Sequence, residues 1–128
     1  MDSNDSTRTL RRVVLVEDDP LLLCSFADSL RELGYDVRET TDPAEALRWI
    51  ERDGADALFT DINMPGMDGR DLAAQARRSV PKLRVVFATG YSVAKVPDLD
   101  DARYLRKPFA PEDMQKALEG AQQAVGTV

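Results

Sequence analysis

Residues 13–20 read Val-Val-Leu-Val-Glu-Asp-Asp-Pro, an apolar run that changes abruptly to acidic residues. Four consecutive apolar residues are typical of a strand that is covered on both faces. Asp19 followed by Pro20 is a typical helix start, because Asp caps the first turn and Pro fits the first helical position. The stretch therefore predicts a buried strand, an acidic strand end and an immediate helix.

The same alternation of strand and helix continues along the chain. Apolar runs predict five strands, at residues 13–16, 35–37, 57–59, 83–88 and 103–105. Between them apolar residues recur at spacings of three and four, as in amphipathic helices. This order predicts an α/β fold, a doubly wound five-stranded parallel sheet with helices on both faces. Residues 90–102 contain Pro97 and little periodicity, so we expect the fourth helix to be short or distorted.

Size and composition indicate one compact domain. The chain has 128 residues, of which 43% are hydrophobic, and a net charge of −6. We expect residues 10–125 to form the domain and residues 1–9 to form a disordered tail. The negative charge argues against a nucleic-acid partner, and no apolar run is long enough to span a membrane. We expect a cytoplasmic protein in which Cys24, within an apolar run, is a buried reduced thiol.

Polar side chains follow the predicted strands, at the edge where open parallel sheets bind ligands. They are Glu17, Asp18 and Asp19 after the first strand, Asp61 after the third, Thr89 after the fourth and Lys107 after the fifth. Carboxylates that converge on one site repel each other unless a cation lies between them. Mg²⁺ fits, because it prefers oxygen ligands and leaves room for phosphate. Asp19, which precedes Pro20, is expected mainly to cap the helix.

These side chains together predict a phosphoryl-transfer site. Asp61 can act as a nucleophile toward phosphorus and form an acyl phosphate. The ammonium of Lys107 can pair with carboxylates and then with phosphoryl oxygens, and the Thr89 hydroxyl can donate to the same oxygens. The backbone carbonyl of Asn63 can complete a metal shell. Each residue alone also has an ordinary structural explanation, so the prediction depends on their combination at consecutive strand ends.

Four separated motifs, spread over residues 12–124, resemble bacterial response-regulator receiver domains of the CheY-like, single-domain type. They are Val14-Leu-Val-Glu-Asp-Asp-Pro20, Asp61-Ile-Asn-Met-Pro-Gly-Met-Asp-Gly69, Ala88-Thr-Gly-Tyr91 and Tyr104-Leu-Arg-Lys-Pro-Phe109. The resemblance implies a flavodoxin-like sheet with strand order 2-1-3-4-5. It also implies a two-component phosphorelay protein, a phosphoacceptor signalling domain that assists its own phosphorylation and dephosphorylation and is not an enzyme.

The resemblance assigns a role to each site residue. Asp61 is the phosphoacceptor, and Mg²⁺ (or Mn²⁺) is bound by Asp18, Asp61 and the carbonyl of Asn63, with Glu17 acting through water. Lys107 contacts the phosphoryl group and precedes a cis peptide bond to Pro108.

The resemblance also implies a switch and partners. Thr89 and Tyr104 are the coupled switch residues. The phosphoryl donor is a histidine kinase or a histidine phosphotransfer protein, and the output is binding to a downstream protein partner. The chain has no His, so it is not itself the histidine donor. We expect a monomer or a weak dimer.

The sequence is also compatible with other functions. The stretch 87–91 also resembles receivers of hybrid histidine kinases, from which this domain could be excised, and a single-domain subgroup in α-proteobacterial stress signalling. A small Mg²⁺-dependent aspartyl phosphatase of the haloacid-dehalogenase type would need a second Asp where Asn63 stands. A flavodoxin-like cofactor binder would need a phosphate cradle in place of Glu17-Asp18-Asp19. A docking-only receiver would not need the complete acidic set.

Overall fold

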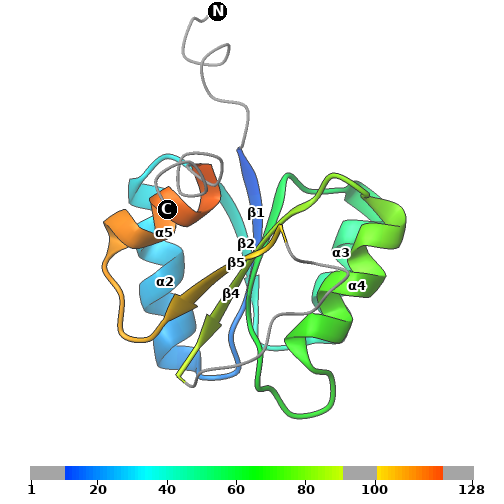
Figure 1. The fold of residues 1–128 in the computed structure, drawn as a ribbon, viewed down its shortest axis with the longest axis horizontal. Coiled ribbons are helices and arrows are strands. Elements are labelled where there is room, and N and C mark those ends of the chain that lie inside the picture. Colours follow the sequence, from blue (N-terminus) through cyan, green and yellow to red (C-terminus); the bar gives the residue numbers. More distant parts are fainter. Residues whose placement is uncertain (1–10, 91–100, 120–128) are drawn as a thin grey trace, which may run out of the picture.

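The computed structural model of the chain describes residues 11–90 and 101–119. Its elements alternate between strand and helix over most of this length (Figure 1). The strands are β1 (Arg12–Val16), β2 (Asp36–Thr40), β3 (Ala57–Asp61), β4 (Arg84–Thr89) and β5 (Arg103–Arg106). The helices are α2 (Pro20–Glu32), α3 (Pro43–Asp53), α4 (Gly69–Ser79) and α5 (Pro111–Glu119).

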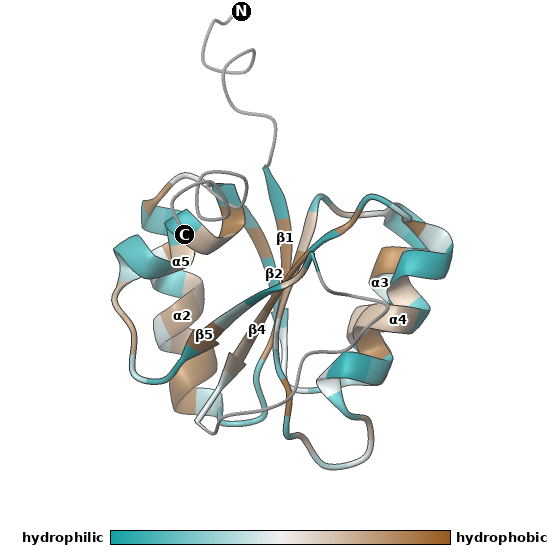
Figure 2. Cartoon of the chain, in the orientation of Figure 1, coloured by the Kyte–Doolittle hydropathy of each residue, from teal (hydrophilic) through white to brown (hydrophobic). Residues whose placement is uncertain are grey.

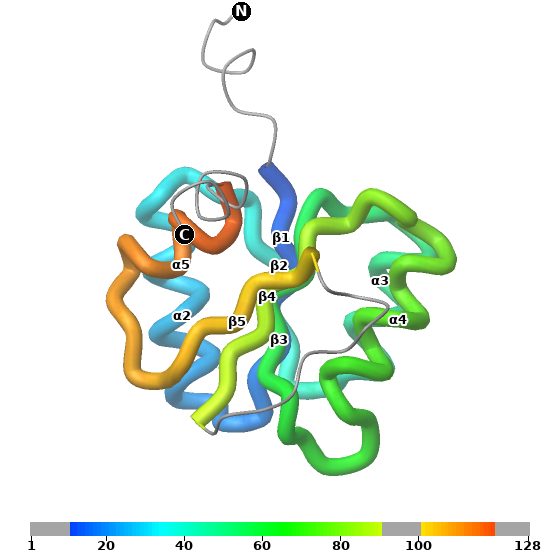
Figure 3. Tube along the Cα trace, viewed as in Figure 1, coloured from blue at the N-terminus to red at the C-terminus, as the bar shows by residue number. Residues whose placement is uncertain are grey.

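The five strands form one parallel sheet with the order β2-β1-β3-β4-β5. Helices α2 and α5 cover one face of this sheet, and α3 and α4 cover the other (Figure 1). Although α2 and α5 are far apart in sequence, they lie side by side (Figure 3). The predicted fold class and strand order are confirmed, and the most apolar strands are central.

Helix starts follow the capping chemistry predicted from the sequence. The Asp19 carboxylate accepts a hydrogen bond of 3.0 Å from the backbone N–H of Leu21, and Pro20 is the first residue of α2. The Asp42 carboxylate accepts one of 2.9 Å from Ala44 at the start of α3. A carboxylate at this position satisfies a backbone donor that has no partner inside the helix. The prediction that Asp19 caps a helix is therefore confirmed.

The core has two layers, one on each face of the sheet, and Figure 2 shows apolar residues on the sides of the helices that face the strands. Alternate residues of each strand point into opposite layers. In β1, Leu15 belongs to the layer under α2 and α5, and Val14 belongs to the layer under α3 and α4. Both faces of β3 are buried, so Asp61 stands at the end of a strand that is shielded from water.

Two local predictions were wrong. Cys24 is exposed, not buried. In α2 the residues that face the sheet are Leu23, Ala27 and Leu30, and the next residue after Leu23 is rotated by about 100° around the helix axis. Strand β2 covers Asp36–Thr40 and so begins and ends later than the predicted residues 35–37. As an edge strand it can have the polar sequence Asp-Val-Arg-Glu-Thr. A search for apolar runs does not detect such a strand.

Several predictions fall on residues outside the described ranges. They concern the N-terminal tail, most of the fourth-helix segment and the end of the domain beyond residue 119. Among residues 11–90 and 101–119, no helix has the length and apolar character needed to cross a membrane.

Candidate functional site

Three carboxylates meet at the carboxyl ends of β1 and β3. Strand β1 pairs in parallel with β3, with Val16 opposite Thr60, so the residues that follow lie at the same sheet edge. One carboxylate oxygen from each of Glu17, Asp18 and Asp61 lies within 4.8 Å of the other two. Glu17 and Asp61 are buried, with 2% and 7% exposure, and Asp18 is exposed. The cluster is therefore open to solvent through Asp18.

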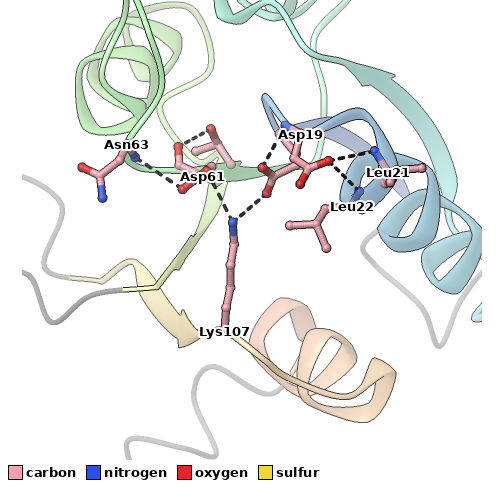
Figure 4. Close-up of polar contacts among 8 residues, drawn as sticks. Asp19, Leu21, Leu22, Asp61, Asn63 and Lys107 are labelled. Atoms are coloured by element: carbon pink, nitrogen blue, oxygen red, sulfur yellow. Dashed lines mark hydrogen bonds and ion pairs between the residues drawn. The ribbon is translucent and has the colours of Figure 1, made fainter.

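Lys107 brings a positive charge to this cluster from the edge strand. Its Nζ lies 2.9 Å from Oε1 of Glu17 and 3.4 Å from Oδ2 of Asp61 (Figure 4). Its backbone N–H donates a hydrogen bond of 2.8 Å to the carbonyl of Thr89, which fixes it beside the end of β4. The peptide bond between Lys107 and Pro108 is cis. The ammonium thus bridges two carboxylates that come from different strands.

Burial and charge act in opposite directions on these groups. Burial raises the pKa of Glu17. The hydrogen bond from Lys107 and its positive charge act in the opposite direction, but the pKa remains above its ordinary value. For Lys107, burial alone would lower the pKa, but the hydrogen bond to Glu17 and the charges of Glu17 and Asp61 outweigh burial and raise it. Lys107 therefore stays protonated at neutral pH.

Backbone groups orient the carboxylates further. The N–H of Asn63 donates a hydrogen bond of 3.3 Å to Oδ1 of Asp61, and the N–H of Asp19 donates one of 3.2 Å to Oε2 of Glu17 (Figure 4). The carboxylate of Asp19 itself points to the start of α2 and is not in the cluster. The structure therefore separates Asp18, a cluster member, from Asp19, a helix cap.

Thr89 lies on β4, the strand next to that of Asp61, and Tyr104 lies on β5, one strand further out. Thr89 is the buried last residue of β4, and its neighbour Ala88 pairs with Asp61 across the sheet. Tyr104 in β5 pairs with Phe87, and the centroids of their rings are 5.1 Å apart. Tyr104 is half-buried and packs against the core layer under α3 and α4. Thr89 is thus buried beside the strand of Asp61, whereas Tyr104 is half-buried on the edge strand β5.

Two residues of this edge were not predicted as site residues. Thr60 is fully buried, and its hydroxyl donates a hydrogen bond of 2.9 Å to the backbone carbonyl of Asp61. A Cβ at Gly69 would lie 2.1 Å from the same carbonyl oxygen. The sequence offers one signal, a Gly directly after the helix-capping Asp68, but only the structure shows what it touches.

The chemistry of the cluster suits a hard divalent cation. Its three carboxylates supply anionic oxygens, and the exposed position of Asp18 leaves room for water and phosphate oxygens. Mg²⁺ binds through one or two carboxylates and keeps several waters. The residues present therefore fit Mg²⁺.

Residues 13–119 match the family described as the response regulator receiver domain. The chain is 36% identical over 114 residues to the response regulator receiver protein CpdR of Brucella abortus (strain 2308), a match that covers 86% of this chain and 95% of that protein. Several other curated relatives are longer, and the chain spans about half of their length.

Solved structures show the same fold. The receiver domain from the hybrid histidine kinase CckA is 30% identical, with a TM-score of 0.73 over 86% of this chain and 97% of that one. The response regulator TrrA from Thermotoga maritima, solved in complex with Mg²⁺-BeF, is 25% identical, with a TM-score of 0.76 over 88% of this chain and 99% of that one. With its five-stranded sheet and its acidic strand ends, the chain belongs to the response regulator receiver domain family, the signalling domain of bacterial two-component systems.

Proposed function

We propose that this receiver accepts a phosphoryl group on Asp61 from a histidine kinase or a histidine phosphotransfer protein. The observation that carries the proposal is the convergence of Glu17, Asp18 and Asp61 with the ammonium of Lys107 at one edge of the sheet. An oxygen nucleophile, a cation and a set of metal ligands are the parts that phosphoryl transfer requires. Membership of the receiver family also favours this function over the phosphatase and flavin-binding alternatives.

The transfer is an exchange of one bond for another. A carboxylate oxygen of Asp61 attacks the donor phosphorus, the new O–P bond forms as the N–P bond to the donor histidine breaks, and the imidazole leaves with its electron pair. In this proposal Asp18, Asp61 and the carbonyl of Asn63 bind Mg²⁺ (or Mn²⁺) directly, and Glu17 acts through water. When bound, the ion neutralises negative charge on the carboxylates and the phosphoryl oxygens. The structure of the similar protein TrrA with Mg²⁺-BeF supports this choice of ion.

Lys107 supplies the second positive charge. It is already paired with Asp61 and Glu17, so it needs no large movement to contact a phosphoryl oxygen on Asp61. An ammonium at this position binds oxygens of the transferred group. The chain thereby assists its own phosphorylation and, later, dephosphorylation.

The output in this proposal is a shift between two conformations. The Thr89 hydroxyl moves toward the phosphoryl group, and the ring of Tyr104 then turns inward. The pairing of β4 with both β3 and β5 supports this route, because Thr89 lies between the strands of Asp61 and Tyr104. Phosphorylation then changes binding to a downstream protein partner by shifting an existing equilibrium. The chain works in the cytoplasm as a monomer or weak dimer, either on its own or as the receiver of a hybrid histidine kinase.

The experiment is intact-mass analysis after incubation with acetyl phosphate, with and without Mg²⁺. Wild type gains one phosphoryl group in the presence of Mg²⁺, and Asp61→Asn gains none. The matched control is Asp36→Asn, which alters an exposed Asp at the amino end of β2, on the opposite edge of the sheet. It should be phosphorylated like wild type. Phosphorylation of Asp61→Asn at the wild-type rate would show that another residue is the acceptor.

A further inference from the structure

The backbone carbonyl of Asp61 is enclosed from two sides. The hydroxyl of Thr60 donates a hydrogen bond of 2.9 Å to its oxygen. The first residue of α4, Gly69, leaves so little space that a Cβ would lie 2.1 Å from this oxygen and 3.0 Å from the carbonyl carbon. No real Cβ approaches a backbone atom so closely, so a side chain at residue 69 would force the end of β3 and the start of α4 apart.

The hydroxyl of Thr60 stands in apolar surroundings. Thr60 is 0% exposed, and both Leu58, on the same face of β3, and Ile62, just after β3, belong to the core layer under α3 and α4. A Val would have the same shape there and would need no partner. A buried hydroxyl is costly unless it is hydrogen-bonded, and here the bond goes to the carbonyl of Asp61.

A glycine is needed at residue 69 because a side chain would not fit, and not because the backbone has a positive φ. The described glycines with positive φ are Gly34, Gly54 and Gly66. Gly69 is not among them, and its N–H donates a hydrogen bond of 2.9 Å to the carbonyl of Ile62. The first residue of α4 therefore packs directly against the backbone of Asp61 and Ile62.

We propose that Thr60 and Gly69 are positioning residues that hold the peptide plane of Asp61 and thereby set the direction of its carboxylate toward the donor phosphorus. The inference rests on the proposed function of Asp61. The peptide group is planar, so a tilt of the carbonyl rotates the backbone at Asp61 and moves its side chain. A misplacement of about 1 Å at a reacting atom costs a rate factor of about 10².

The first test compares Thr60→Val with Thr60→Ser. The readout is the phosphorylation rate at saturating Mg²⁺ and acetyl phosphate, with the melting temperature of each variant measured in parallel. We expect Thr60→Val to react about tenfold more slowly, because it loses the bond that holds the carbonyl, and to melt near wild type. Thr60→Ser restores the hydroxyl and the rate. A Thr60→Val protein that reacts at the wild-type rate would overturn the proposal.

The second test uses Gly69→Ala with Gly54→Ala as the matched control. Gly54 has a φ of 74° and open space around its Cβ position, so an Ala there strains the backbone far from Asp61. We expect Gly69→Ala to lose phosphorylation and to bind beryllofluoride with Mg²⁺ more weakly by ¹⁹F NMR. Gly54→Ala loses stability but keeps the wild-type rate per folded molecule. If both variants lost rate in proportion to stability, the role of Gly69 would be structural only.

The outcomes separate this inference from the proposed function. If wild type takes up no phosphoryl group from acetyl phosphate or from a phosphohistidine donor, the proposed function fails and the inference fails with it. If wild type is phosphorylated on Asp61 and Thr60→Val is equally fast, the inference alone fails. Thr60→Val provides this answer even if Gly69→Ala does not fold.

Discussion

The Nζ of Lys107 lies 2.9 Å from Oε1 of Glu17, although 90 residues separate the two along the chain. The Glu17 carboxylate is almost fully buried, and the side chain of Lys107 is 22% exposed. A buried carboxylate without a cation is costly, so this pair explains how the fold tolerates an acidic cluster at a shielded strand end. It also links the edge strand β5 to the centre of the sheet.

Replacing Lys107 by Ala should destabilise the protein and make it depend more on Mg²⁺. The change leaves the carboxylates of Glu17 and Asp61 without their cation, and we expect the free energy of unfolding to fall by about 1–3 kcal/mol. Because Mg²⁺ binding replaces the lost charge, Mg²⁺ should raise the melting temperature more for Lys107→Ala than for wild type. Urea unfolding and thermal melting with and without Mg²⁺ measure both effects. The control is Lys116→Ala, which alters an exposed Lys on α5. If Mg²⁺ raised the melting temperature equally in wild type, Lys107→Ala and Lys116→Ala, the prediction would be contradicted.

Asp18 and Asp19 should respond differently to mutation although they are neighbours. Asp18 belongs to the carboxylate cluster, whereas Asp19 caps α2. We expect Asp18→Asn to lower Mg²⁺ affinity by about tenfold or more, since even the outer partners of metal ligands contribute 10- to 100-fold. Asp19→Ala should lower stability by about 1 kcal/mol, and Asp19→Ser should restore it.

Titration calorimetry with Mg²⁺ and urea unfolding test this pair of predictions together. A loss of Mg²⁺ affinity in Asp19→Ala as large as that in Asp18→Asn would show that Asp19 is part of the metal site.

The hydroxyl of Tyr35 should stabilise the end of α5. Tyr35, just before β2, is 4% exposed, and its hydroxyl donates a hydrogen bond of 2.5 Å to Oε2 of Glu119, the last residue of α5. Removing a hydrogen bond to a charged group costs about 1.5–3 kcal/mol, so we expect Tyr35→Phe to lower the free energy of unfolding by about that amount. A double-mutant cycle with Glu119→Ala, followed by urea unfolding, isolates the pair. Additive effects of the two changes would mean that the bond contributes nothing to stability.

The carboxyl of Asp53 should titrate well below its ordinary range. Hydrogen bonds from Arg52 and then from Arg38 lower its pKa from 3.8 to about 2. A lowered pKa in the folded state stabilises the protein at pH values above the ordinary pKa, and this benefit disappears as the pH falls from 3.8 through about 2. Asp53 lies at the surface, so the gain in stability is small.

Carbon-detected NMR of the Asp53 side chain measures this titration. Arg38→Gln, which removes one donor, should raise the midpoint, and Arg48→Gln on an exposed position of α3 should not. A midpoint near 3.8 in wild type would contradict the ion pair seen in the structure.

Much of the fold could be predicted because local patterns specify the elements. The run Val13–Val16 had to be shielded on both faces, and β1 is a central strand with both faces buried. The two Asp-Pro pairs predicted helix starts at Pro20 and Pro43, and both were found. Strand β2 was misplaced because an edge strand needs only one apolar face, which weakens the signal of an apolar run.

The candidate site could be predicted in outline for a similar reason. Parallel strands bring their carboxyl ends to one edge, so the residues after each strand had to be neighbours. The contacts around the backbone carbonyl of Asp61 could not be predicted, since they depend on how closely α4 approaches β3 and on the direction of the Thr60 hydroxyl. The burial of Cys24 was predicted wrongly because the direction in which a helix faces depends on the sheet below it.

Periodicity, capping residues and the polar residues at strand ends are properties of short segments, and they were sufficient to establish a doubly wound sheet with an acidic edge. The pairing of Glu17 with Lys107 joins segments that are distant in sequence, and the close approach of Gly69 to Asp61 joins α4 to the end of β3. The exposure of Cys24 depends on which side of α2 faces the sheet. Such contacts form only when helices and strands pack to the density of a protein interior. For this reason the tertiary structure alone established how the residues of the site touch.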